Sequence, residues 1–318
     1  MADPIKWRSK IILAKINSDA YGTDPVPTGA ANAILMTDVE LRPMEGQDVS
    51  RNLERPFIGA QQSVPVGVHV VLTGSVELVG SGDTGVAPAW GPLMRMCGVA
   101  EVVTPDDAPG DGTVEYTPVS DEHEDGAIYF WIGPTQHKMT GVRGDWEWTH
   151  NAQAIPVVRF TLTGLFAAPA DATRPTVDLT GFQPPQVATK TNTPTFTLGG
   201  VPLVLSQFSF KLGNAVEQRL LIGREAVLIN DRNEQIAARV EAVPLTTFNP
   251  FAAAFASTEH PLVLEHGTVA GKRIKLEAPH CTVARLSGYE QSQNVLEWPL
   301  SLSPQPLAGD DQWTLTLS

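Results

Sequence analysis

The sequence is poor in cysteine and in long apolar runs, which excludes several common protein classes. Only two cysteines, Cys97 and Cys281, occur in 318 residues, too few for a disulfide scaffold or a zinc site with paired cysteines. We expect both to be buried reduced thiols, Cys97 in a helix and Cys281 on a strand. No run approaches the ~20 apolar residues that span a bilayer, and the N-terminus lacks the layout of a secretory signal. We therefore expect folding in a cytoplasm and no membrane partner.

Basic residues are also scarce. Lys and Arg total 22 against 35 Asp and Glu, a formal net charge of −13, and residues 105–125 are rich in acid without one Lys or Arg. Nucleic-acid-binding proteins gain affinity from Lys and Arg that displace counterions from phosphates. This composition therefore argues against gripping nucleic acid, although it permits nucleic acid to pass. With 42% hydrophobic and only 18% charged residues, the chain should nonetheless build packed cores.

Patterns typical of catalysis are weak. Residues 80–85 fit G-x-G-x-x-G, but the preceding strand alternates and no βαβ unit follows, so we interpret them as a loop and expect no cofactor. The acidic run 121–125, with His123, is a candidate site for a hard cation, but contiguous side chains diverge and a solvated loop is favoured. Residues 231–234 begin like a calcium loop without its later glycine and glutamate. We expect no enzyme, with no catalytic, cofactor or metal residues.

Alternating apolar and polar positions dominate the chain and predict a mainly β protein. A strand pair, a short helix with a proline near its start and a closing strand occur in the first half and again, in order, in the second. The first copy runs 34–41, 68–78, helix 90–99 and 157–163, and the second runs 203–212, 235–242, helix 251–258 and 295–301. Duplication of a β-rich unit points to a ring or array rather than a single-pocket enzyme.

The duplication predicts two tandem domains, residues 1–170 and residues 195–318, each with one short flanking α-helix. The first domain carries an acidic insertion at 105–125. Residues 171–194 form a Pro-rich, semi-rigid linker, in which 176–180 could add as an edge strand.

Two long excursions, 42–65 and 213–233, separate strands within the copies. Loops of this length inside a compact domain are usually functional. We expect them to reach a neighbouring subunit, with a hairpin tip at 230–233.

Four segments resemble the tail tube protein, or major tail protein, of bacteriophages with long non-contractile tails. They are Tyr21–Leu35, Val76–Leu93 leading to Cys97–Ala100, Phe208–Val216 and Ile229–Arg232. The resemblance implies tail-tube-type β-sandwich or barrel domains and rings that stack into a hollow tube for genome delivery. It implies as partners further copies of the chain, the tape measure, terminator and baseplate proteins, and double-stranded DNA passing without specific binding. The expected location is the virion tail, assembled in the host cytoplasm.

The dimensions of a closed wall predict the number of chains per ring. If each domain adds four strands at ~4.8 Å and a tilt of ~40°, six domains leave a bore of roughly 38 Å. Three domains leave roughly 14 Å, too narrow for duplex DNA, and twelve leave roughly 87 Å. We therefore predict a homotrimer with pseudo-sixfold symmetry, and an acidic bore would keep passage low in friction.

The candidate contact residues between rings or subunits are charged side chains of the two excursions. They are Glu45, Asp48, Arg51, Glu54, Arg55, Arg224, Asp231 and Arg232; Arg51 and Arg55 in particular should make charge-assisted contacts. Three alternatives stay open. One is a tail terminator or baseplate hub of the same fold, and the second is a metal-dependent hydrolase that uses His123. The third is a carbohydrate-binding module that uses Trp146 and Trp148, whose indoles share one strand face, although core or interface burial of the pair is favoured.

Overall fold

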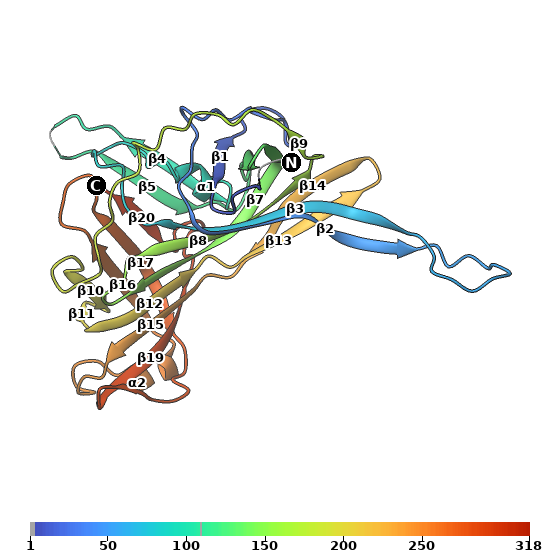
Figure 1. Cartoon of the computed structure of the whole chain (residues 1–318). Coiled ribbons are helices and arrows are strands. Elements are labelled where there is room, and N and C mark those ends of the chain that lie inside the picture. Colours follow the sequence, from blue (N-terminus) through green and yellow to red (C-terminus); the bar gives the residue numbers. More distant parts are fainter. Residues whose placement is uncertain (1–3, 109) are drawn as a thin grey trace.

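The computed structural model describes residues 4–108 and 110–318, so residues 1–3 and residue 109 of the acidic insertion lie outside the description. The prediction of a mainly β fold is confirmed. Within the described residues, 18 strands form one sheet, two more form a separate hairpin, and there are two short helices. Figure 1 shows most strands gathered in one body, from which two long hairpins project on the same side.

The first half of the chain pairs its strands in the order β1–β6–β7–β8–β3–β2, all antiparallel. The sheet order thus begins with the first strand, continues with three strands that follow the β4–β5 hairpin in sequence, and ends with the two strands that precede α1. The elements are β1 Lys10–Ile16, β2 Thr37–Ser50, β3 Ser63–Glu77, α1 Gly91–Arg95, β4 Val99–Thr104, β5 Thr113–Pro118, β6 Gly126–Ile132, β7 Thr135–Asn151, β8 Val157–Phe166 and β9 Ala170–Asp171.

The second half repeats this order as β10–β16–β17–β19–β15–β12. Its elements are β10 Thr195–Leu198, β11 Val201–Pro202, β12 Leu205–Lys211, β13 Asn214–Leu221, β14 Arg224–Arg232, β15 Gln235–Glu241, α2 Pro250–Ala256, β16 Glu259–His266, β17 Ile274–Val283, β18 Glu290–Ser292, β19 Val295–Pro304 and β20 Thr314–Leu317. The hairpin β4–β5 has no counterpart between α2 and β16, so the acidic insertion is the main addition to the first unit. We call the two halves the first and second units; the domain boundaries predicted above stay predictions.

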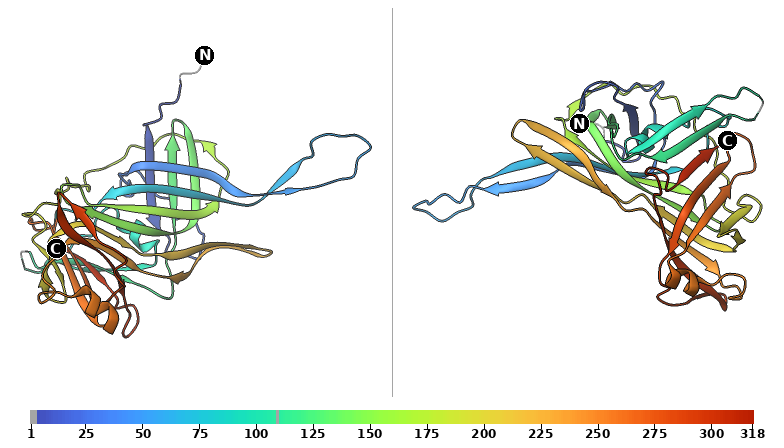
Figure 2. Two further views of the ribbon diagram at one scale, coloured as in Figure 1. Left: turned by 90° about the horizontal axis from the view of Figure 1, so that it is seen from below. Right: turned by 180° about the vertical axis from the view of Figure 1, so that it is seen from behind.

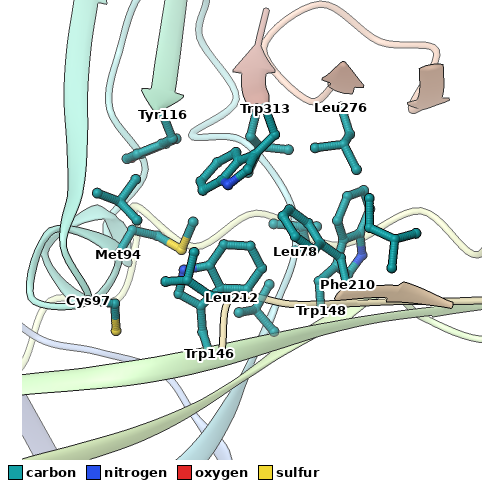
Figure 3. Packing of buried hydrophobic residues seen from close by; sticks show 14 of the residues in the cluster. Leu78, Met94, Cys97, Tyr116, Trp146, Trp148, Phe210, Leu212, Leu276 and Trp313 are labelled. Atoms are coloured by element: carbon teal, nitrogen blue, oxygen red, sulfur yellow. The ribbon is translucent and has the colours of Figure 1, made fainter. Parts of the chain in front are cut away.

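The two units share one sheet and one core. β12 pairs with the end of β7, and β20 pairs with β5 of the first unit and β17 of the second. Figure 3 shows Trp146, Phe210 and Trp313 meeting edge to face in this core; their ring centroids are 5.1 to 5.7 Å apart. Burial of large aromatic side chains from both units therefore holds them together.

Both predicted excursions are hairpins rather than loops, which corrects the sequence interpretation. Strands β2 and β3 extend to Ser50 and Ser63, and only 51–62 form the tip. β13 and β14 pair through the second excursion, and their turn lies at Ile222-Gly223, so 230–233 is not a hairpin tip. β2 and β13 contain no fully buried residue, and the part of β3 within the first excursion is exposed, so apolar alternation is weak there. We call β2–β3 the long arm and β13–β14 the short arm; Figure 2 shows both projecting from the body.

Smaller differences concern the helices and the linker. α1 ends at Arg95, so Cys97 lies just beyond it rather than within it, before Gly98 at φ +70°. Cys281 lies on β17 as predicted, and both cysteines are buried free thiols. Residues 176–180 form no strand in the described chain. α2 begins where the Asn249 side chain accepts hydrogen bonds from two first-turn N–H groups, an ordinary N-cap.

Candidate assembly interface

The contact between the units begins with an edge-to-edge pairing of β7 and β12. Five residues from Gln207 to Lys211 pair antiparallel with Asn151 to Glu147. The Lys211 Nζ lies 3.6 Å from a Glu147 carboxylate oxygen across this seam. Main-chain hydrogen bonds supply the attachment, and side-chain alternation specifies the register.

The base of the short arm covers the end of α1. The Asn214 side-chain amide donates to the carbonyl oxygens of Cys97, at 2.7 Å, and Gly144, at 2.9 Å. The Arg232 guanidinium donates to the carbonyl of Gly98 at 2.7 Å and to that of Val119 at 3.0 Å. Carbonyl groups at the end of a helix lack intrahelical donors, so the second unit completes the hydrogen bonding of the first.

Burial of this contact changes the acidity of its charged groups. Burial raises the pKa of the Asp145 carboxyl, whose oxygen accepts the Asn214 N–H at 3.0 Å. Burial lowers the pKa of Arg232, whose side chain is only 10% exposed. Charged groups that leave water in this way need nearby partners. The contact is thus a permanent part of the fold rather than a transient surface.

A second set of first-unit side chains holds the short arm at Val227. The Tyr21 hydroxyl accepts the Val227 N–H at 2.6 Å and donates to the Gly141 carbonyl at 2.8 Å. Arg143 donates to the Val227 carbonyl at 3.0 Å. Burial raises the pKa of Tyr21 and lowers that of Arg143.

Several strands of the described chain pair on one side only, and two of them, β2 and β18, bear on assembly. β2 pairs only with β3, and β18 pairs only with β19. The row of neighbouring strands therefore runs β2–β3–β8–β7–β12–β15–β19–β18 and ends in a free edge on both sides. β18 is held flat against the sheet because Arg239 bonds its Glu290 at 2.7 Å and its Gln291 carbonyl at 3.1 Å.

One face of this row packs on the core and the other is polar. Side chains on the open face are mostly small or neutral, and charges of both signs lie among them; they include Glu147, Thr149, Arg159, Thr161, Gln207, Ser209, Lys211, Ala237, Arg239 and Ser301. Glu147 lies between Arg159 on one neighbouring strand and Lys211 on the other. The acidic hairpin β4–β5 lies on the opposite side, because Tyr116 of β5 stacks on Trp90 in the core. The open face is therefore not acidic.

All the predicted contact residues lie on the arms, but one of them does not point its charged group outward. Asp48, Arg51, Glu54, Arg55, Arg224 and Asp231 are exposed, and half-buried Glu45 pairs with Arg42 at 3.2 Å. The exception is Arg232, whose guanidinium is used inside the chain as described above. Apolar tip residues accompany the charges, since Ile58 and Ile222 are fully exposed and Phe57 is 66% exposed.

The structure gives little support to the alternative metal and carbohydrate sites. Across residues 4–108 and 110–318, no three His, Cys, Asp or Glu side chains gather as a metal site. His123 bonds the Val119 carbonyl at 2.9 Å, and burial lowers its pKa. Trp146 and Trp148 are at most 2% exposed, so the sugar-platform interpretation is wrong and the predicted burial is confirmed. Neither described helix is long and apolar enough to cross a membrane.

Comparison with known proteins adds no identity. No protein-family model matches the chain, and no curated protein sequence matches it significantly.

Proposed function

We propose that this chain is a structural tail protein of a bacteriophage, whose rings stack into the tube that conducts the genome. The ring is a homotrimer with pseudo-sixfold symmetry. The observation that carries the proposal is the seam between β7 and β12. Two units with the same strand order meet edge to edge there, while the edges at both ends of the row, β2 and β18, lack partners within the described chain.

Repeating the internal seam between chains closes a ring. Each unit supplies four strands to the row, β2–β3–β8–β7 and then β12–β15–β19–β18. Neighbouring strands in the row alternate in direction, and the first and last strands, β2 and β18, run in opposite directions. β18 of one chain can therefore pair antiparallel with β2 of the next. Three chains give 24 strands and a wall roughly 48 Å across at ~4.8 Å spacing. Closure also removes two free edges, which would otherwise invite aggregation.

The open face of the sheet suits the lining of such a wall. Small neutral side chains separate its charges, and two of its cations are paired with carboxylates, Lys211 with Glu147 and Arg239 with Glu290 and Glu297. DNA phosphates would therefore meet few unpaired cations. The hairpin β4–β5 would then lie on the outer surface with its acidic residues, in contrast to the acidic bore considered above. The two arms project together and would reach the neighbouring ring, with Arg51 and Arg55 in contact with it.

The proposal implies partners that follow from a tube. These are further copies of the chain, the tape measure, terminator and baseplate proteins, and double-stranded DNA that passes without specific binding. No enzymatic role, cofactor or membrane partner is proposed.

Electron microscopy and mass measurement of the purified protein test the proposal. We expect long uniform tubes, and rings with a mass three times the chain's 34.2 kDa. Isolated rings without tubes would favour a terminator or hub. A protein that stays monomeric at high concentration, or rings of six chains, would refute the proposed ring.

A further inference from the structure

The second unit carries an apolar surface that its counterpart in the first unit does not. On α2, Phe255 is 95% exposed and Phe251 41%, and Tyr289, 62% exposed, lies 6.4 Å from Phe251 between ring centroids. We call these three residues the α2 patch. In α1, by contrast, Leu93 and Met94 are fully buried. Clustered exposed aromatic side chains usually mark an interaction site.

The structure itself shows what covers the corresponding helix end in the first unit. The base of the short arm lies on the end of α1, where Asn214 and Arg232 donate to the carbonyls of Cys97 and Gly98. The short arm follows β12, the counterpart of β2, just as the long arm continues from the start of β2. If α2 is covered in the same way as α1, the covering element is the base of a long arm.

The two arms also correspond in detail at their bases. The segment Gly46-Gln47-Asp48-Val49 matches Gly213-Asn214-Ala215-Val216, and each segment lies at a shift in strand register. A Cβ atom on Gly46 would lie 2.8 Å from the Val66 carbonyl oxygen, and one on Gly213 would lie 2.2 Å from that of Asn233. Both glycines thus allow the same close approach of the opposing strand. Gln47 then takes the place of Asn214, and Val49 that of Val216.

The long arm of the same chain cannot reach the α2 patch. β2 and β18 are at opposite ends of an eight-strand row, seven strand spacings or roughly 34 Å apart. Gln47 and Val49 are both exposed, Val49 at 53%. Both halves of the contact are therefore available for another molecule of the same sequence.

We propose that the α2 patch is the docking surface for the base of the long arm of a second copy of this chain. Val49 packs against Phe255 and its aromatic neighbours, Gln47 donates to carbonyls at the end of α2, and β18 pairs with β2 beside them. The contact is heterologous, since each chain offers its patch to one neighbour and its arm to the other. This inference rests on the proposed function, because the same contact repeated three times closes the ring.

Substitutions at exposed positions test the contact without disturbing the core. Phe255→Asp and Val49→Asp each place a charge in the proposed interface, and Leu307→Asp, at a 72% exposed loop position, is the matched control. Self-association is measured by mass photometry and sedimentation, with circular dichroism as the check on folding. Loss of a Phe or Val side chain that the proposed interface would bury should weaken self-association roughly tenfold or more. The control should assemble like the unaltered chain.

Mixing the two variants tests whether the long arm of a second copy is what binds the α2 patch. Phe255→Asp keeps an intact arm and Val49→Asp an intact patch, so the mixture should form a complex of two chains that neither variant forms alone. If Phe255→Asp forms rings like the unaltered protein, or the mixture stays monomeric, the docking inference is overturned although the ring proposal stands. If the unaltered protein and the Leu307→Asp control fail to form rings, the proposed function fails instead.

Discussion

Replacement of Trp313 by alanine should destabilise the whole chain rather than one unit. Trp313 has no exposed surface and lies between two units, with ring centroids 5.7 Å from Trp146 of the first and 5.4 Å from Phe210 of the second. Its strand neighbours in β20 pair with both units as well. Trp313→Ala leaves a large cavity at this point, and truncation of a buried aromatic side chain costs about 3–5 kcal/mol.

That cost is a large part of the ~5–15 kcal/mol by which ordinary domains are stable. Trp313→Phe is the matched comparison, because it keeps a ring in place. It also removes the indole N–H, which has no hydrogen-bond partner in the structure. We expect it to cost about 1 kcal/mol, much less than the alanine variant.

Equilibrium unfolding in urea, followed by fluorescence and by circular dichroism, measures both variants. Protein concentrations must keep the chain monomeric, since assembly would add its own stabilisation. The two signals should change together in one transition that moves to lower urea in Trp313→Ala. A loss below 1 kcal/mol, or a second transition that the substitution leaves in place, would show that the units do not share this core.

Three further predictions concern local features. Burial lowers the pKa of His150 from 6.5 to about 3, so the unfolded chain binds a proton that the folded chain does not. Stability should then fall as pH drops through this range, and between pH 6.5 and 5.5 the loss in urea unfolding should be about 1 kcal/mol larger than in His150→Gln. Asn249→Ala removes the α2 cap and should cost about 1 kcal/mol in thermal or urea unfolding; no measurable loss would contradict the cap. Gly223→Ala, at φ +90° with open space around the new Cβ, should cost about 1 kcal/mol. Gly213→Ala, at φ +72° with a carbonyl oxygen 2.2 Å from the new Cβ, should cost about 2–3 kcal/mol, and equal losses in the two variants would refute the close approach.

The sequence predicted the class of fold and the repeated elements because these depend on local patterns. β8, for example, alternates clearly where Val158, Phe160 and Leu162 face the core. The arms were interpreted as loops because their strands pair mainly with each other and bury little. The charged residues in 42–65 and 213–233 therefore indicated correctly that these segments are exposed, but they gave no sign that the segments are strands.

The candidate site was only partly predictable for the same reason. The excursions were predicted to be contact segments, which stays a prediction. Arg232 was assigned to the outside, because no local pattern reveals the carbonyls of Gly98 and Val119 that bind it. Asn214 and Phe255 were missed as contact residues. A signal for Asn214 existed in the match between Gly46–Val49 and Gly213–Val216, which becomes informative once the two arms are aligned.

Strand pairing and aromatic packing join the two units, so the peptide linker between them is less important for holding the fold together than the sequence suggests. The first unit offers β7 and β5 as docking strands, and the second supplies β12 and β20 to them. The aromatic contacts of Trp146 likewise cross from one unit to the other. Two separately produced fragments, divided in the exposed stretch 178–181, should therefore recognise each other and reconstitute the fold, so that the chain is a natural candidate for split-protein complementation.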